Sequence, residues 1–141
     1  MQTEDVFRHI LSELCTFLKK NNENYNWVGI YVLKSGKLEL ECYEGEKTDH
    51  EIISLGDGLC SLAVLKNEIV NEADVTSNPK YLACFPSTRS EIVVPIRLGG
   101  KAIGEIDIDS DRKGVFTEMD ETFLSDVADR ISKLVEYFYR E

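Results

Sequence analysis

The spacing of apolar residues changes twice along this chain, and this change limits the fold more than any other feature of the sequence. Apolar residues recur at helical spacing near the start, between Thr3 as a candidate N-cap and a stop at Asn21 and Asn22. They do so again after Thr117, which forms a capping-box pattern with Asp120. Between these two helices the apolar residues follow the alternating or continuous pattern of β-strands.

The middle of the chain contains strand patterns and one short helical segment. Strands are expected over residues 27–33, 37–43, 52–55, 91–96 and 101–109, with another beginning at Ile69 and Val70. A helix is expected over residues 59–66. This order predicts an α+β fold, with N- and C-terminal helices on one face of an antiparallel sheet and the short helix on the other. We expect a single domain over residues 1–141.

Residues 74–90 follow neither the helical nor the strand spacing of apolar residues. They include Pro79 and Pro86 among Asn, Ser and Thr residues, so we expect an ordered loop with at most one helical turn. Long loops in compact domains often carry function. Cys84 lies in the middle of this loop.

The charge of the chain limits its partners. Its 26 acidic residues outnumber its 16 basic ones, which gives a net charge of −10. Such a surface repels nucleic acids and anionic lipid, so neither is an expected partner. The sequence has no apolar run that could span a bilayer and no signal-peptide pattern after Met1, so we expect a cytoplasmic protein.

Structural disulfides are not expected, because they are rare in cytosolic proteins of this size, so the four cysteines are expected to be buried, metal-binding or redox-active. Cys15 and Cys42 fit ordinary buried cysteines. Cys60 stands at a predicted helix start, where free amide groups favour a thiolate. The loop position of Cys84 is compatible with either burial or a redox role.

No metal site is expected. The cysteines form no C-x-x-C pair, and the chain has only two histidines. A calcium loop is suggested by acidic residues at its ligand positions, which are Asp107, Asp109, Asp111 and Glu118. Arg112, however, replaces the glycine that the turn of such a loop needs, so we reject it.

Carboxyl groups share one face of the last predicted strand. Glu105, Asp107 and Asp109 alternate with isoleucines, so their side chains point the same way. Burial and mutual repulsion would raise the pKa of such groups and keep a proton for general acid catalysis. The alternative is a solvated face, which is the commoner case for carboxylates.

Five stretches together resemble one family. They are Asn26-Trp27-Val28-Gly29-Ile30-Tyr31, Gly56-Asp57-Gly58-Leu59-Cys60, Ala83-Cys84, Ser90-Glu91-Ile92-Val93-Val94-Pro95 and Ile106-Asp107-Ile108-Asp109-Ser110. In this order and spacing they are similar to the free methionine-(R)-sulfoxide reductases, a GAF-domain family. The likeness extends from Trp27 to the end of the last helix. A generic GAF sensor would not need a cysteine seven residues before the glutamate.

The resemblance implies the reaction and its catalytic residues. Free L-methionine-(R)-sulfoxide would be reduced to methionine when Cys84 attacks the sulfoxide and becomes a sulfenic acid. Cys60 would then resolve this acid as a Cys60–Cys84 disulfide, which an external thioredoxin-like dithiol would reduce. No bound cofactor is implied.

The resemblance also implies a substrate site. Glu91, Asp107 and Asp109 would hold the amino group and polarise the sulfoxide. Trp27 and Tyr31 would form the wall around the methyl group, although ordinary core packing is the alternative for both aromatics.

One position departs from the family pattern, and other functions stay open. His50 stands where the family commonly has a third cysteine, so the family's three-cysteine route cannot operate in full and Cys84 must meet Cys60 directly. A non-catalytic GAF module that binds a small ligand is one alternative. A redox sensor that uses the same cysteine pair is another. The apolar stripes of the terminal helices are compatible with packing against each other or with a homodimer.

Overall fold

The computed structural model describes residues 1–79, 81 and 85–141. Its helices are α1 (Thr3–Lys20), α2 (Gly58–Lys66) and α3 (Glu118–Glu136), with a 3-10 turn η1 (Val75–Ser77). Its strands are β1 (Trp27–Lys34), β2 (Lys37–Glu44), β3 (Ile52–Ser54), β4 (Val70–Glu72), β5 (Ser90–Leu98) and β6 (Lys101–Ser110). The described residues thus form the elements expected from the sequence, with small shifts at their ends.

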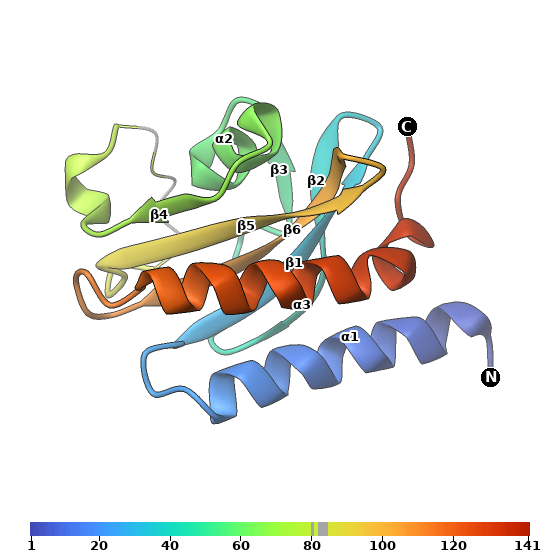
Figure 1. The fold of residues 1–141 in the computed structure, drawn as a ribbon, viewed down its shortest axis with the longest axis horizontal. Helices are drawn as coiled ribbons and strands as arrows, with labels where there is room; N and C mark the ends of the chain where they lie inside the picture. Colours follow the sequence, from blue (N-terminus) through green and yellow to red (C-terminus); the bar gives the residue numbers. More distant parts are fainter. Residues whose placement is uncertain (80, 82–84) are drawn as a thin grey trace.

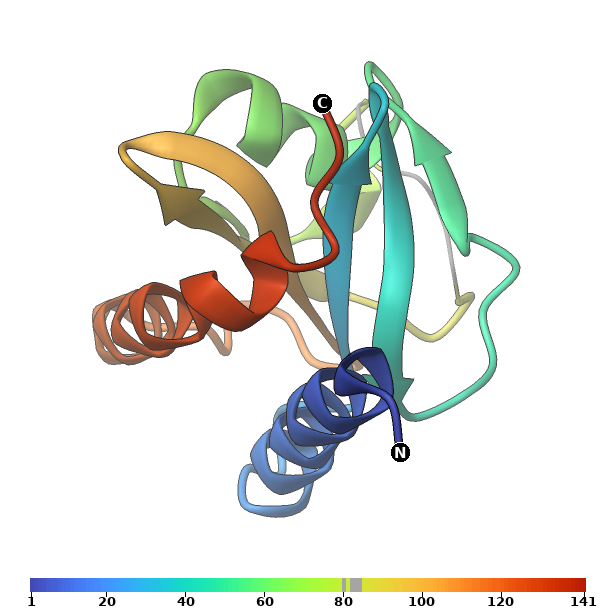
Figure 2. The same ribbon diagram turned by 90° about the vertical axis from the view of Figure 1, so that its right-hand side faces the viewer.

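The strands form one antiparallel sheet in the order β3-β2-β1-β6-β5-β4. The hairpins β1–β2 and β5–β6 meet where β1 pairs with β6 at the centre of the sheet. Helices α1 and α3 cover one face of the sheet, and α2 lies on the opposite face (Figures 1 and 2). This arrangement confirms the predicted α+β fold.

Side chains alternate between two cores, one on each face of the sheet. The core under α1 and α3 contains strand residues Val28, Ile30, Val32, Ile92, Val94, Ile96, Ile103, Ile106 and Ile108. The core under α2 contains Trp27, Tyr31, Leu38 and Val93 from the strands and Leu59, Cys60 and Ala63 from the helix. The sheet is therefore buried on both sides at its centre.

Strand β2 departs from the plain alternation expected over residues 37–43. Ile30 pairs with Cys42 and Tyr31 pairs with Leu40, so Glu41 is an extra residue in β2. A bulge of this kind reverses which face the following side chains occupy. Leu40 consequently faces the α2 side, whereas Cys42 belongs to the core under α1 and α3.

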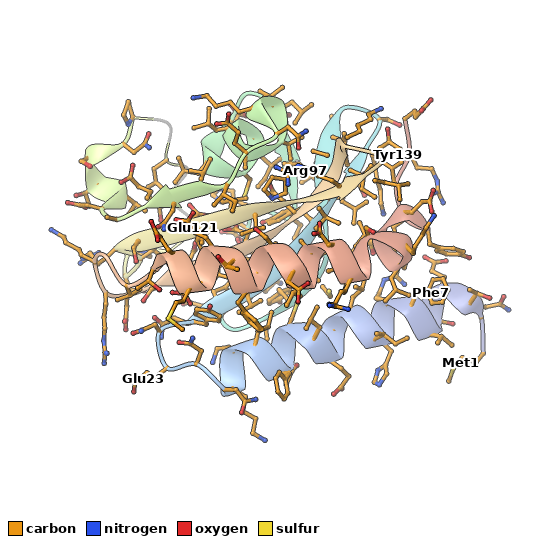
Figure 3. All side chains as sticks on the ribbon, viewed as in Figure 1. Met1, Phe7, Glu23, Arg97, Glu121 and Tyr139 are labelled. Carbon is orange, nitrogen blue, oxygen red and sulfur yellow. The ribbon has the colours of Figure 1, made fainter. Side chains whose placement is uncertain are left out.

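Side chains and backbone conformation define the ends of the helices. Asn67 ends α2 with a left-handed backbone. Arg97 on β5, which is labelled in Figure 3, donates to the side chain and to the carbonyl of Asn67, both at 2.6 Å. Thr117 forms the predicted capping box, since its N–H donates to Asp120 at 2.8 Å. At α1, Gln2 rather than Thr3 is the N-cap. No helix of the described residues is long and apolar enough to cross a membrane.

Candidate active site

Strand pairing gathers acidic residues from two strands on the α2 face. Asp109 on β6 lies opposite Glu91 on β5 and opposite Trp27 on β1. Asp107 lies opposite Gly29, and Glu105 lies opposite Tyr31. Because Ile106 and Ile108 point into the other core, all three acidic residues of β6 point toward α2. Residues far apart in the sequence thereby form one cluster of four carboxyl groups.

This acidic cluster is buried. The exposed fractions of Glu91, Glu105, Asp107 and Asp109 are 5%, 0%, 2% and 3%. Both carboxyl oxygens of Glu105 and one each of Asp107 and Asp109 have no hydrogen-bond partner among the described residues. No lysine or arginine in the described part of the chain forms an ion pair with these three side chains. The face is therefore not a solvated one.

Burial sets the protonation of the cluster. Desolvation raises the pKa of Glu105 well above its ordinary value, and the charge of Asp107 adds to the rise. The same two causes raise the pKa of Asp109 well above its ordinary value. Desolvation also raises the pKa of Asp107, while hydrogen bonds with Glu91 and Cys60 oppose the shift. These shifts favour the protonated form of the carboxyl groups, which general acid catalysis requires.

Cys60 lies in the first turn of α2, directly above the acidic cluster. Its thiol is buried and donates to Oδ2 of Asp107 at 3.3 Å. Desolvation and the charges of the neighbouring carboxylates raise its pKa well above the ordinary value. The expected thiolate at the helix start is therefore wrong. Burial and repulsion outweigh the attraction of the free amide groups.

Trp27 lies on the same face of the sheet, beside Asp109. Its indole N–H donates to the carbonyl of Glu46 at 2.9 Å, and its ring stacks on Tyr43 with centroids 5.7 Å apart. The indole lies across Gly29, where a Cβ would come within 2.3 Å of the ring. The glycine of the Trp-Val-Gly motif thus makes room for the tryptophan two residues before it.

Tyr31 is completely buried in the core under α2. Its hydroxyl donates to the backbone carbonyl of His50 at 2.7 Å. This bond ties β1 to the segment between β2 and β3 and gives Tyr31 a structural role. His50 itself is half-buried.

A pocket of about 90 Å³ opens at the end of this face. It is lined by Asn26, Trp27, Glu46, Phe85, Ser87, Thr88, Asp109, Ser110 and Asp111. Trp27 and Asp109 were expected at the site, but Phe85 and Thr88 were not. Phe85 lies 6.0 Å from Trp27 between ring centroids, and the Thr88 hydroxyl donates to Asp109 at 3.5 Å. Both follow Cys84 closely, which is the only sequence signal that could have found them.

A thiol and two carboxyl groups are close enough to bind one metal ion. Donor atoms of Cys60, Glu91 and Asp107 all lie within 4.8 Å of one another. Binding of a metal would require Cys60 and Asp107 to lose their protons, and burial raises the pKa of both groups. The absence of a metal cofactor stays a prediction. The rejected calcium loop has no basis here, because Asp107 and Asp109 lie within a strand.

Cys84 lies outside the described residues. Its distance from Cys60, and with it the expected Cys60–Cys84 disulfide, therefore stays a prediction. Apart from Tyr31, which lies in the core under α2, the other expected site residues divide into two groups. Asp107, Glu91 and Cys60 come together at one point, and Trp27 and Asp109 line the neighbouring pocket.

Comparison with known proteins shows the family to which the chain belongs. A model of the GAF domain family matches residues 2–135. The free methionine-R-sulfoxide reductase of Escherichia coli is 32% identical over 96% of this chain and 81% of that protein. A type II free methionine-R-sulfoxide reductase from Thermoplasma acidophilum has 60% identity and a TM-score of 0.97 over 99% of both chains. The free methionine-R-sulfoxide reductase from Neisseria meningitidis, in complex with its substrate, has 32% identity and a TM-score of 0.86 over 94% of this chain and 83% of that chain.

Proposed function

This chain belongs to the free methionine-R-sulfoxide reductases of the GAF-domain family, and from that premise we propose that it reduces free L-methionine-(R)-sulfoxide to L-methionine. The observation that carries this proposal is the buried cluster of Glu91, Glu105, Asp107 and Asp109 beside Trp27. No lysine or arginine in the described part of the chain forms an ion pair with Glu105, Asp107 or Asp109. Buried acidic groups of this kind are costly, so they favour a ligand that brings a positive charge.

The acidic cluster explains why a free amino acid would be selected. A free amino acid carries an ammonium group, which can donate charge-assisted hydrogen bonds to carboxylates. A methionine sulfoxide within a peptide has an amide at that position and lacks the charge. We assign ammonium binding to Glu91, Asp107 and Asp109, with Trp27 and Tyr31 as the wall around the methyl group. The indole of Trp27 lies directly beside Asp109 in the sheet.

The first chemical step needs a nucleophile and an acid. The sulfur of Cys84 attacks the sulfoxide sulfur, and a protonated carboxyl group of the cluster donates its proton to the sulfoxide oxygen. The oxygen is transferred to Cys84 as a sulfenic acid, and methionine leaves. Cys84 is thus oxidised by two electrons and the sulfoxide is reduced by two.

The second step regenerates the nucleophile. The sulfur of Cys60 attacks the sulfenic acid of Cys84, which forms a disulfide, and the hydroxyl group leaves as water with the proton that the Cys60 thiol gives up by way of Asp107. Because Cys60 is held as a thiol, it must lose a proton as it attacks. Its hydrogen bond to Asp107 gives that proton a direct acceptor. Asp107 would therefore serve both substrate binding and resolution.

Three further assignments complete the proposal. A thioredoxin-like dithiol reduces the disulfide, and the need for such a reductant places the enzyme in the cytoplasm. No bound cofactor takes part. A homodimer would bury the apolar residues on the outer surfaces of α1 and α3, since Phe17, Met119 and Phe123 are exposed there and line one groove.

Turnover of the two epimers of methionine sulfoxide tests the proposed activity. The purified protein is incubated with each free epimer and a dithiol, and methionine is measured. Methionine should form from the R epimer in many turnovers. A protein that binds the sulfoxide without forming methionine would be a ligand-binding module instead. Disulfide formation by peroxide, without methionine formation, would indicate a redox sensor.

Two cysteine variants test the assigned steps. Cys84→Ser should abolish methionine formation, because no nucleophile remains. Cys60→Ser should release about one equivalent of methionine and then stall, because the sulfenic acid is not resolved. Cys15→Ser is the matched control, since Cys15 lies in the other core. Full multiple turnover by Cys84→Ser would contradict the assignment.

A further inference from the structure

A second pair of cysteines lies on the opposite face of the sheet from Cys60. Cys15 on α1 and Cys42 on β2 place their sulfur atoms 3.7 Å apart. The exposed fraction of Cys15 is 0%, and that of Cys42 is 8%. The proposed reductase cycle uses neither residue, and both belong to the core under α1 and α3.

The bulge in β2 creates this contact. Without the extra residue Glu41, Cys42 would share the face of Leu40 and point away from α1. The bulge turns Cys42 toward Cys15, so two sulfur atoms separated by 27 positions in the sequence meet. A disulfide has an S–S distance of about 2.05 Å, so side-chain movement of less than roughly 2 Å would close the bond.

A groove gives small molecules access to this pair. It has a volume of about 300 Å³ and is lined by Arg8, Ser12, Leu40, Glu41, Cys42, Tyr43 and Glu51. Cys42 borders this groove, whereas Cys15 on α1 is completely buried. An oxidant would therefore reach Cys42 first.

We propose that Cys15 and Cys42 form a second redox-active pair, which a peroxide oxidises to a disulfide that ties α1 to the sheet. Peroxide transfers one oxygen atom to the sulfur of Cys42, which gives a sulfenic acid and water. The sulfur of Cys15 then displaces the hydroxyl group, which forms the disulfide and a second water. The two thiols lose two electrons, and the peroxide gains them.

The environment of Cys15 sets the pace of closure. The hydrogen bond to Cys42 is the largest cause that raises the pKa of the Cys15 thiol, and burial raises this pKa further. Because the thiolate is the attacking form, we expect slow closure of the disulfide. Such a slow reaction suits a stabilising cross-link and not a step in each catalytic turnover.

A variant that contains only this pair tests the proposal. In Cys60→Ala/Cys84→Ala, hydrogen peroxide should remove two hydrogen atoms from the intact monomer, and peptide mapping should join the peptides of Cys15 and Cys42. The cross-link should raise Tm by roughly 10 °C, and a dithiol should reverse the shift. The matched control also carries Cys15→Ala and should show neither the cross-link nor the rise in Tm.

The alternative results each overturn the proposal. They are a monomer whose two thiols both react with an alkylating agent after peroxide treatment and unfolding, a monomer that only gains oxygen, and a covalent dimer. If the double variant does not fold, peptide mapping of the oxidised wild-type protein decides the matter. A peptide pair joined through Cys15 and Cys42 supports the proposal there, and its absence overturns it.

Discussion

The two faces of strand β6 show opposite uses of buried positions. Ile106 and Ile108 point toward α1 and α3 and fill a core of apolar side chains. Glu105, Asp107 and Asp109 point toward α2 and are just as deeply buried, although four of their six carboxyl oxygens have no hydrogen-bond partner among the described residues. One face therefore stabilises the fold by removing apolar surface from water, whereas the other costs stability through desolvation.

This difference separates residues that support the fold from residues that serve the reaction. A costly arrangement persists in a protein when it does something that a cheaper arrangement cannot do. Here the acidic face holds protons and negative charge beside a thiol. We therefore expect substitutions on the acidic face to reduce activity more than stability. Substitutions on the apolar face should do the opposite.

The largest expected effect is loss of activity in Asp107→Asn. This change keeps the shape of the side chain but removes the charge and the proton acceptor of Cys60, so kcat/KM should fall by about 10²–10⁴-fold. The free energy of unfolding should stay equal or rise, because a buried ionisable group is gone. Urea unfolding and initial rates measure the two quantities.

Its matched control is the neighbouring Ile108→Ala. The change should lower the free energy of unfolding by about 2–5 kcal/mol, because it leaves a cavity in the core. Activity per folded molecule should stay near that of the wild type. If Asp107→Asn instead unfolds the protein while Ile108→Ala loses turnover, the contrast between the faces is wrong.

Two glycines on opposite faces provide a smaller, sharper contrast. In Gly29→Ala the new Cβ would come within 2.3 Å of the Trp27 ring, and in Gly104→Ala it would come within 2.6 Å of the Tyr31 carbonyl. Both changes should cost about 1–3 kcal/mol of stability through overpacking. Only Gly29→Ala should also raise KM, since it displaces the indole. Equal KM values for the two variants would argue against a role for Trp27 in binding.

The pH dependence of stability should reveal the acidic face. The pKa of Glu105 is raised on folding. Its contribution to stability is therefore fully present below the pKa that Glu105 has in the unfolded chain, and it is lost as pH rises toward the pKa in the folded protein. Above about pH 4.5, a carboxyl group that keeps its proton only in the folded state makes the free energy of unfolding fall by about 1.4 kcal/mol for each unit that the pH rises. Glu105→Gln should flatten the curve by that amount. A slope identical to that of the wild type would mean that Glu105 ionises freely.

The smallest expected effect belongs to Tyr31→Phe. It removes the hydroxyl that donates to the carbonyl of His50, so stability should fall by about 0.5–1.5 kcal/mol. If Tyr31 serves mainly as core, KM should change less than twofold. A large rise in KM with unchanged stability would instead place its hydroxyl in substrate binding.

The sequence was most informative where a pattern is local. Helical spacing located α1 and α3, and the Thr117–Asp120 pair marked the start of α3. Alternation placed the three acidic residues of β6 on one face. These features depend on residues within a few positions of one another, and the chain geometry of a helix or strand fixes them.

The sequence was least informative where distant residues meet. It could not decide between a solvated and a buried acidic face, because the answer depends on whether α2 packs over β6. It also suggested a thiolate at Cys60, since the helix start is a local signal while the carboxylates below it are not. The bulge that turns Cys42 toward Cys15 left no clear pattern in the strand either.

The sequence by itself therefore determined the order of the elements, the shared face of the acidic residues of β6 and, through its motifs, the family. The tertiary structure alone decided which carboxyl groups are buried, that Cys60 stays a thiol above Asp107, and that Cys15 and Cys42 touch. The reason is physical. Local geometry depends on neighbours in the chain, whereas desolvation and charge coupling depend on whatever the folded chain brings near.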